Sequence, residues 1–176
     1  MKKLGHSLLE NFMVKSHQKN MRRKNDMSKH HGNCACGDVE VDIAFDPLLE
    51  FQCHCSICKL HHGTSLSALA FGEDELTING SLESYSWTGG SGEVISKHYC
   101  PNCGVPIFIK PEVLGGMVYV PAGLLMPDYD FQPKVELWTD GRPQWMNQAP
   151  SIVESFPDNG TIERIQLILG NLDQRA

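Results

Sequence analysis

The 176-residue sequence contains no run of the roughly 18 consecutive apolar residues that a membrane-spanning helix needs. Its first 30 residues also lack the continuous apolar stretch of a signal peptide, because His6, Glu10 and Lys15 interrupt it. These absences predict a cytoplasmic protein without a membrane partner. Cysteines in that reducing compartment are expected to be thiols, available to metal ions, rather than disulfides.

Positive charge is scarce outside the first 30 residues. Those residues carry eight Lys and Arg side chains and two acidic ones, a net charge of +6, whereas the other 146 carry seven basic and nineteen acidic side chains, a net charge of −12. An acidic body argues against nucleic acid as the main partner. The polar, basic composition of residues 1–30 is typical of disordered segments, so we predict a flexible leader there.

The sequence lacks the regular alternation of strands and helices that builds a parallel sheet. Residues 39–45 alternate between apolar and other side chains, which is typical of a half-buried strand. Many short strands at close spacing, separated by turn signals such as Asn79-Gly80, predict a mainly β protein with antiparallel sheets. The expected strands cover residues 39–45, 65–71, 76–78, 81–87, 93–99, 106–109, 117–121 and 134–138.

No phosphate-binding loop is evident, because the glycine-rich run at residues 89–92 lacks a preceding strand and a following helix in the required arrangement. We interpret this run as a flexible hairpin tip. We predict three regions: the leader (1–30), a β domain (31–145) and a C-terminal extension (146–176). The extension should contain a short helix, whose apolar face is formed by Ile162, Ile165, Ile168, Leu169 and Leu172.

The seven cysteines are an odd number, so no scheme of disulfides alone can pair them all. They fall into three clusters, at Cys34 and Cys36, at Cys53, Cys55 and Cys58, and at Cys100 and Cys103. A structural zinc site usually takes four protein ligands, whereas a catalytic site keeps three and an open position. Seven cysteines therefore suggest one closed zinc site and one open site.

Cys100-Pro101-Asn102-Cys103-Gly104 has the spacing of a zinc-ribbon half-site at the tip of a predicted hairpin. Cys34 and Cys36 can supply the other half, which would join distant parts of the chain. Cys34 and Cys36 can instead combine with two cysteines of the 53–58 cluster, but that division leaves the half-site at Cys100 and Cys103 without partners.

The cluster of Cys53, Cys55 and Cys58 supplies three thiolates within six residues. His61 or His62 can add a fourth ligand and close a structural site, whereas His54 is sterically awkward between two bound neighbours. The alternative is a position open to water or a substrate thiol. Three thiolates make zinc a weak Lewis acid, better suited to binding sulfur or polarising a carbonyl than to forming hydroxide.

Three motifs resemble the glutathione-dependent formaldehyde-activating enzyme family, which also contains the centromere protein V-like proteins. They are Gly32-Asn33-Cys34-Ala35-Cys36-Gly37, Cys53-His54-Cys55-Ser56-Ile57-Cys58-Lys59 and His98-Tyr99-Cys100-Pro101-Asn102-Cys103-Gly104, within a match over about residues 31–145. One departure is Lys59, where an arginine often follows the third cysteine. Lysine keeps the positive charge but not the planar fork of a guanidinium group.

The resemblance implies a β-tent fold with two zinc ions. Cys34, Cys36, Cys100 and Cys103 would hold the structural ion, and Cys53, Cys55 and Cys58 the catalytic ion. It also implies a carbon–sulfur lyase that joins glutathione and formaldehyde into S-(hydroxymethyl)glutathione, so that the partners are a small thiol and a small aldehyde. The oligomeric state stays open.

Several other residues are candidates for the site. Neutral His61 and His62 are candidates for moving a proton, and Lys59 for attracting a carboxylate of glutathione. Tyr85, Trp87, Trp138 and Trp145 either line a substrate pocket or pack in the core. The competing hypotheses are a non-enzymatic zinc-stabilised β domain that binds a protein partner, a glutathione carrier, and a redox-responsive switch.

Overall fold

The computed structural model describes residues 28–160, 163, 166, 167, 170 and 171. Residues 1–27 of the predicted leader lie outside this range, as do all five apolar residues on which the C-terminal helix prediction depends (Ile162, Ile165, Ile168, Leu169 and Leu172). The five described residues beyond 160 are helical. Among the residues that the structure describes, no helix has the length and apolar character needed to cross a membrane.

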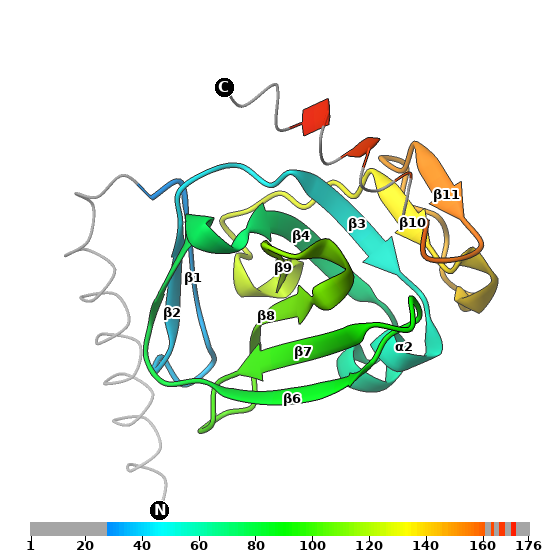
Figure 1. The fold of residues 1–176 in the computed structure, drawn as a ribbon. Helices are drawn as coiled ribbons and strands as arrows, with labels where there is room; N and C mark the ends of the chain where they lie inside the picture. Colours follow the sequence, from blue (N-terminus) through cyan, green and yellow to red (C-terminus); the bar gives the residue numbers. More distant parts are fainter. Residues whose placement is uncertain (1–27, 161–162, 164–165, 168–169, 172–176) are drawn as a thin grey trace, which may run out of the picture.

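Two β-sheets form the framework of the described chain, which confirms the mainly β prediction (Figure 1). The smaller sheet has the strand order β1-β2-β5, and the larger one β11-β10-β3-β4-β9-β8-β7-β6. The strands are β1 (His30–Asn33), β2 (Glu40–Ile43), β3 (Leu49–Cys53), β4 (Leu66–Gly72), β5 (Leu76–Asn79), β6 (Glu83–Thr88), β7 (Val94–Tyr99), β8 (Pro106–Pro111), β9 (Met117–Pro121), β10 (Val135–Leu137) and β11 (Glu154–Phe156). The helices are α2 (Ser56–His62) and the 3₁₀ turns η1 (Glu73–Glu75), η2 (Glu112–Leu114), η3 (Ala122–Leu124) and η4 (Thr139–Gly141).

All eight expected strands are present, with ends that differ by a few residues. The prediction did not include β1, β3, β11 or α2. The larger sheet also differs from the antiparallel expectation, because β10 pairs in parallel with both β3 and β11. After β9 the chain passes through η3 and a long connection to the far side of β3, and such a crossover is what parallel pairing requires.

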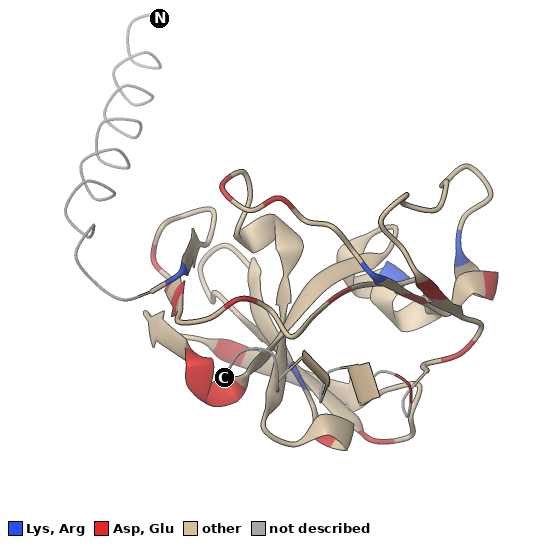
Figure 2. Cartoon of the chain, turned by 90° about the horizontal axis from the view of Figure 1, so that it is seen from above, with Lys and Arg blue, Asp and Glu red and all other residues tan. Residues whose placement is uncertain are grey.

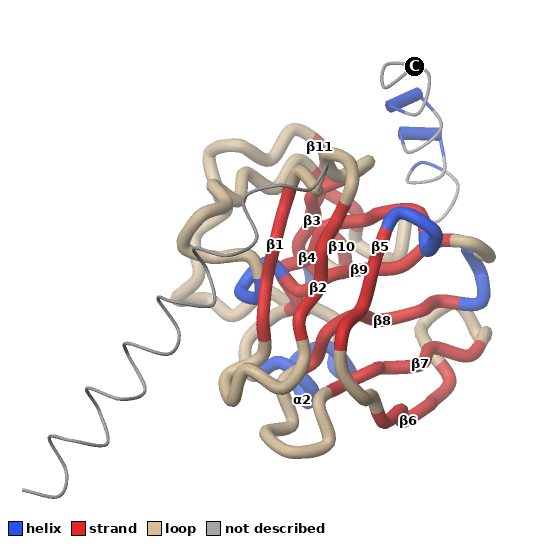
Figure 3. Tube along the Cα trace, turned by 90° about the vertical axis from the view of Figure 1, so that its left-hand side faces the viewer, coloured by secondary structure: helices blue, strands red, loops and turns tan. Residues whose placement is uncertain are grey.

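The central part of the larger sheet is buried on both faces, as its strand β4 shows. Leu69 and Phe71 point into a core shared with the smaller sheet, whereas Ala68 and Ala70 belong to a second core on the opposite face. Alternate side chains of a strand point to opposite faces, so one strand serves both cores. Figure 3 shows the smaller sheet lying across the larger one.

Acidic residues are distributed along much of the described chain, and basic residues are few (Figure 2). One of these few, Lys29, pairs with Asp46, and His30 Nε2 lies 3.0 Å from the other oxygen of that carboxylate. The backbone amide of Lys29 also donates to the carbonyl of Ile43 at 2.7 Å. The end of the predicted leader, residues 28–30, therefore runs directly into the smaller sheet.

Candidate metal centres

Four cysteines from two distant turns converge in the first core. Cys34 and Cys36 lie between β1 and β2, and Cys100 and Cys103 lie between β7 and β8. Their four sulfur atoms all lie within 4.8 Å of one another. The Sγ–Sγ distance is 3.4 Å between Cys34 and Cys36 and 3.6 Å between Cys36 and Cys100. The fold thus brings together the two half-sites that the sequence suggested.

The geometry of this four-sulfur cluster fits zinc. A zinc–sulfur bond of about 2.3 Å gives a tetrahedron with edges of about 3.8 Å, close to the two observed distances. The Val39 amide donates to Cys34 Sγ at 3.3 Å, and the backbone amide of Val105 is the main cause that lowers the pKa of Cys103 to about 6. Gly104, with a φ of 72°, supplies the left-handed turn after the last cysteine. These features hold the sulfur atoms around one central point.

The other three cysteines lie where β3 meets α2, on the opposite face of the larger sheet. Cys53 ends β3, Cys55 caps the N-terminus of α2, and Cys58 lies in its first turn. The Cys58 amide donates to Cys55 Sγ at 3.2 Å, and the three sulfur atoms lie within 4.8 Å of one another. Cys53 belongs to the second core, whereas Cys34 and Cys100 belong to the first.

Ionisation of these three thiols shows why they suit a cation. Hydrogen bonds from Cys53 and Cys58 lower the pKa of Cys55 to about 2, and the hydrogen bond to Cys55 raises the pKa of Cys53 to about 12. Hydrogen bonds to Cys53 and Cys55 also raise the pKa of Cys58. Without a cation, ionisation of one thiol therefore opposes ionisation of the other two. A bound divalent cation would allow all three to ionise, so the donor set fits a metal ion.

The predicted histidines lie beside this triplet without joining it. Among the described residues, the metal-ligating group at this place contains three cysteines and no histidine. His61 stacks on Trp87, with ring centroids 4.3 Å apart. His62 lines the pocket described below, and burial, with smaller effects of His61 and Lys97, lowers its pKa to about 4, so it is neutral at pH 7. Lys59 Nζ donates to the carbonyl of Gly141 at 2.9 Å.

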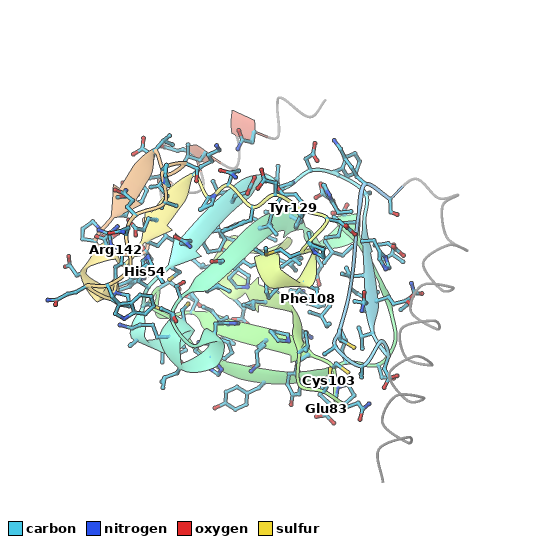
Figure 4. The ribbon with its side chains drawn as sticks, turned by 180° about the vertical axis from the view of Figure 1, so that it is seen from behind. His54, Glu83, Cys103, Phe108, Tyr129 and Arg142 are labelled. Carbon is cyan, nitrogen blue, oxygen red and sulfur yellow. The ribbon has the colours of Figure 1, made fainter. Side chains whose placement is uncertain are left out.

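A buried polar network that the sequence does not predict lies beside the triplet. His54 is fully buried, and its Nε2 lies 2.9 Å from Oε1 of Glu136, which is 1% exposed. Arg142 Nη1 donates to both oxygens of Glu136, at 3.2 and 3.4 Å, and Ser155 Oγ donates to Oε2 at 3.3 Å. Figure 4 shows His54 and Arg142 close together and far from Cys103. Burial outweighs the effect of Glu136 and lowers the pKa of His54.

Replacing Glu136 by leucine should destabilise the protein by roughly 1–3 kcal/mol, because the buried Nε2 of His54 then loses its partner. Glu136→Gln should cost less, since the amide oxygen can still accept from His54. Urea denaturation measures both effects, with Glu93→Gln at an exposed position as the control. A Glu136→Leu midpoint equal to that of the unmodified protein would contradict this account.

A pocket opens beside the triplet, on the face away from the smaller sheet. Of the four aromatic residues proposed for a pocket or the core, Trp87 and Trp138 line this pocket. Tyr85 (56% exposed) and Trp145 (72% exposed) do not. The residues that line the pocket are Phe51, Cys53, Cys55, Ile57, Cys58, His62, Leu66, Trp87, Gly89, Gly90, Ser91, Ile95, Ile109, Pro111, Val113, Tyr119, Leu137, Trp138 and Asn159.

The glycine-rich run forms the β6–β7 turn, as expected of a hairpin tip, and its backbone makes one wall of this pocket. A Cβ atom at Gly90 would lie 2.8 Å from Cζ2 of Trp138, which is closer than side chains pack. Glycine thus lets this turn lie directly on the indole ring. Sequence alone did not indicate this role, because the contact joins residues far apart in the chain.

The fold and the two cysteine sites define a class of mainly β proteins with two candidate thiolate metal centres on opposite faces of one sheet. The family model described as "Glutathione-dependent formaldehyde-activating enzyme" matches residues 29–141, and the chain belongs to this family. A comparison with curated proteins gave no match. Among solved structures, a Rhodobacter sphaeroides protein is similar, with 21% identity, a TM-score of 0.43, and coverage of 55% of this chain and 88% of the other.

Proposed function

We propose that this protein is a carbon–sulfur lyase that joins a thiol of the glutathione type to an aldehyde and cleaves the same adduct. The observation that carries the proposal is the triplet of Cys53, Cys55 and Cys58, whose sulfur atoms converge at the wall of a pocket without a fourth ligand from the described residues. Cys34, Cys36, Cys100 and Cys103 would hold a structural zinc, and the triplet a catalytic zinc.

The reaction needs one new bond and one proton transfer. The thiol sulfur bonds to the carbonyl carbon, the carbon–oxygen double bond becomes single, and the thiol proton ends on the oxygen. A zinc bound by the triplet would supply positive charge that favours a thiolate. His62 lines the same pocket, and its lowered pKa makes it a weak base, so it would hold the transferred proton only in passing from the sulfur to the oxygen. Lys59 keeps ammonium N–H groups beyond its bond to Gly141, and these can meet a carboxylate of glutathione.

The test is the rate at which glutathione and formaldehyde exchange with their adduct, followed by NMR magnetisation transfer. We expect faster exchange with the zinc-loaded protein than in buffer, and a return to the buffer rate after chelation. Metal analysis of the same sample should give two zinc ions per chain. Glutathione binding without faster exchange would indicate a carrier, and an exchange rate equal to that of buffer would remove the lyase assignment.

A further inference from the structure

We infer that the aldehyde taken by this site carries a sizeable apolar group, branched aliphatic or aromatic, and that formaldehyde is a poorer substrate. This inference rests on the proposed lyase function and specifies its substrate class. The physical basis is a mismatch between the pocket and the two reactants named by the family description. Formaldehyde has no carbon substituent, and glutathione is highly charged.

The pocket beside the triplet contains no Lys, Arg, Asp or Glu among its described lining residues. Its inner part is made of side chains from the second core, among them Phe51, Leu66, Ile109 and Tyr119. The rings of Phe51 and Tyr119 pack edge to face, with centroids 4.9 Å apart, so this wall is held in place. The polar residues of the lining are the three cysteines, His62, Ser91 and Asn159, so most of the surface favours hydrocarbon and no described Lys, Arg, Asp or Glu is there to pair with a charged end of a substrate.

Glutathione carries two carboxylates and an ammonium group, and burying such charges without partners is costly. Neither nearby lysine lines the pocket: Lys59 is bonded to Gly141, and Lys97 acts on His62 only through its charge. The ends of the thiol substrate are therefore best placed at the rim, with only its sulfur at the triplet. The apolar interior remains for the carbon group of the aldehyde.

The shape of the pocket suits a flat or branched group. Trp87 and Trp138 contribute aromatic rings to its lining, and the Gly89–Ser91 backbone forms a further wall. On the outer side, His61 stacks on Trp87 at 4.3 Å, and this contact supports the indole from behind. An apolar substituent can thus contact rigid aromatic surfaces within reach of the three sulfur atoms, whereas formaldehyde leaves those surfaces uncovered.

The first test compares aldehydes with glutathione held constant. Magnetisation transfer gives the protein-dependent acceleration for formaldehyde, acetaldehyde, 3-methylbutanal and phenylacetaldehyde, each relative to its own rate in buffer. We expect the acceleration per mole of enzyme at low substrate to rise tenfold or more from formaldehyde to 3-methylbutanal, since a single methylene in an apolar pocket can already be worth about tenfold. Equal or greater acceleration with formaldehyde would overturn the inference.

If the protein accelerates the reaction of no aldehyde, the proposed lyase function is removed. A binding measurement then tests separately whether the pocket takes apolar groups. The chain has three tryptophans, and Trp145→Phe leaves only the two that line the pocket. Quenching of their fluorescence should saturate at a lower concentration of 2-phenylethanol than of methanol. Absence of saturable binding would contradict an apolar site. Faster exchange for apolar thiols but not for apolar aldehydes would assign the pocket to the thiol and overturn the inference as stated.

Gly90→Ala provides a variant that changes the pocket alone. The added methyl group would lie 2.8 Å from Cζ2 of Trp138, so the indole ring or the turn must move. That movement changes the space that the pocket offers to a large substituent. We expect the loss with phenylacetaldehyde to exceed the loss with formaldehyde by several-fold or more. Gly115→Ala is the matched control, because a Cβ atom there meets nothing within 4 Å and the residue does not line the pocket. Equal losses for both aldehydes in Gly90→Ala would contradict the assignment.

Discussion

The Cys100→Ala variant is expected to lose cooperative folding altogether. Cys100 is fully buried in the first core, and its sulfur belongs to the cluster that joins the β1–β2 and β7–β8 turns. Structural zinc contributes apparent binding free energies of about 10–16 kcal/mol in zinc-finger peptides, which is as large as the total stability of about 5–15 kcal/mol of an ordinary domain. Thermal unfolding followed by circular dichroism should show no transition, or one far below that of the unmodified protein.

Two controls separate the loss of metal from the loss of core packing. Cys100→Ser keeps the size of the side chain but removes the thiolate, so it should fail as severely as Cys100→Ala if a metal ion is responsible. Val120→Ala, at a fully buried position of the same core, should cost only a few kcal/mol. If Cys100→Ser unfolds like the unmodified protein, the four sulfur atoms do not hold a stabilising metal ion.

The sequence predicted the β architecture well where strands alternate or end at glycine-rich turns, and less well elsewhere. The eight expected strands are all present, and the predicted hairpin tip at Cys100 to Cys103 joins β7 to β8. The parallel position of β10 was not predictable, because it depends on a long connection whose path is set by tertiary packing. Strand β3 has alternating buried residues, but it is short and runs directly into the cysteine triplet.

The candidate site shows a similar division. The spacing of the cysteines indicated both sulfur clusters, since neighbouring ligands in a turn converge locally. The carboxylate of Glu136 was not recognised, because a charged residue between Val135 and Leu137 in a short strand normally faces water. In the fold it instead faces His54, a residue 82 positions away. The pocket was also not predictable, because its walls come from segments that only the folded chain brings together.

The Cys58→Ala variant is expected to lose the lyase rate while the protein stays folded. Cys58 lies in the short helix α2 and is partly exposed, whereas Cys53 is buried within β3, so Cys58 is the better choice for separating chemistry from stability. Two thiolates would remain, too few for the proposed catalytic zinc. Removing a group that only supports a metal ligand lowers activity by up to about a hundredfold. Because Cys58 would be a ligand itself, its loss should lower the exchange rate by at least about that factor. Metal analysis should fall from two zinc ions to one.

Leu60→Ala is the matched control for Cys58→Ala, because Leu60 lies in the same helix and is 81% exposed. Its rate and zinc content should equal those of the unmodified protein. An unchanged rate in Cys58→Ala would place the chemistry away from the triplet. If Cys58→Ala instead unfolds as Cys100→Ala does, the triplet is a second structural site and the proposed open position is lost. The two clusters lie on opposite faces of one sheet, so they can be changed one at a time. The enzyme hypothesis requires that Cys100→Ala lower the stability of the protein and that Cys58→Ala lower the exchange rate without unfolding it.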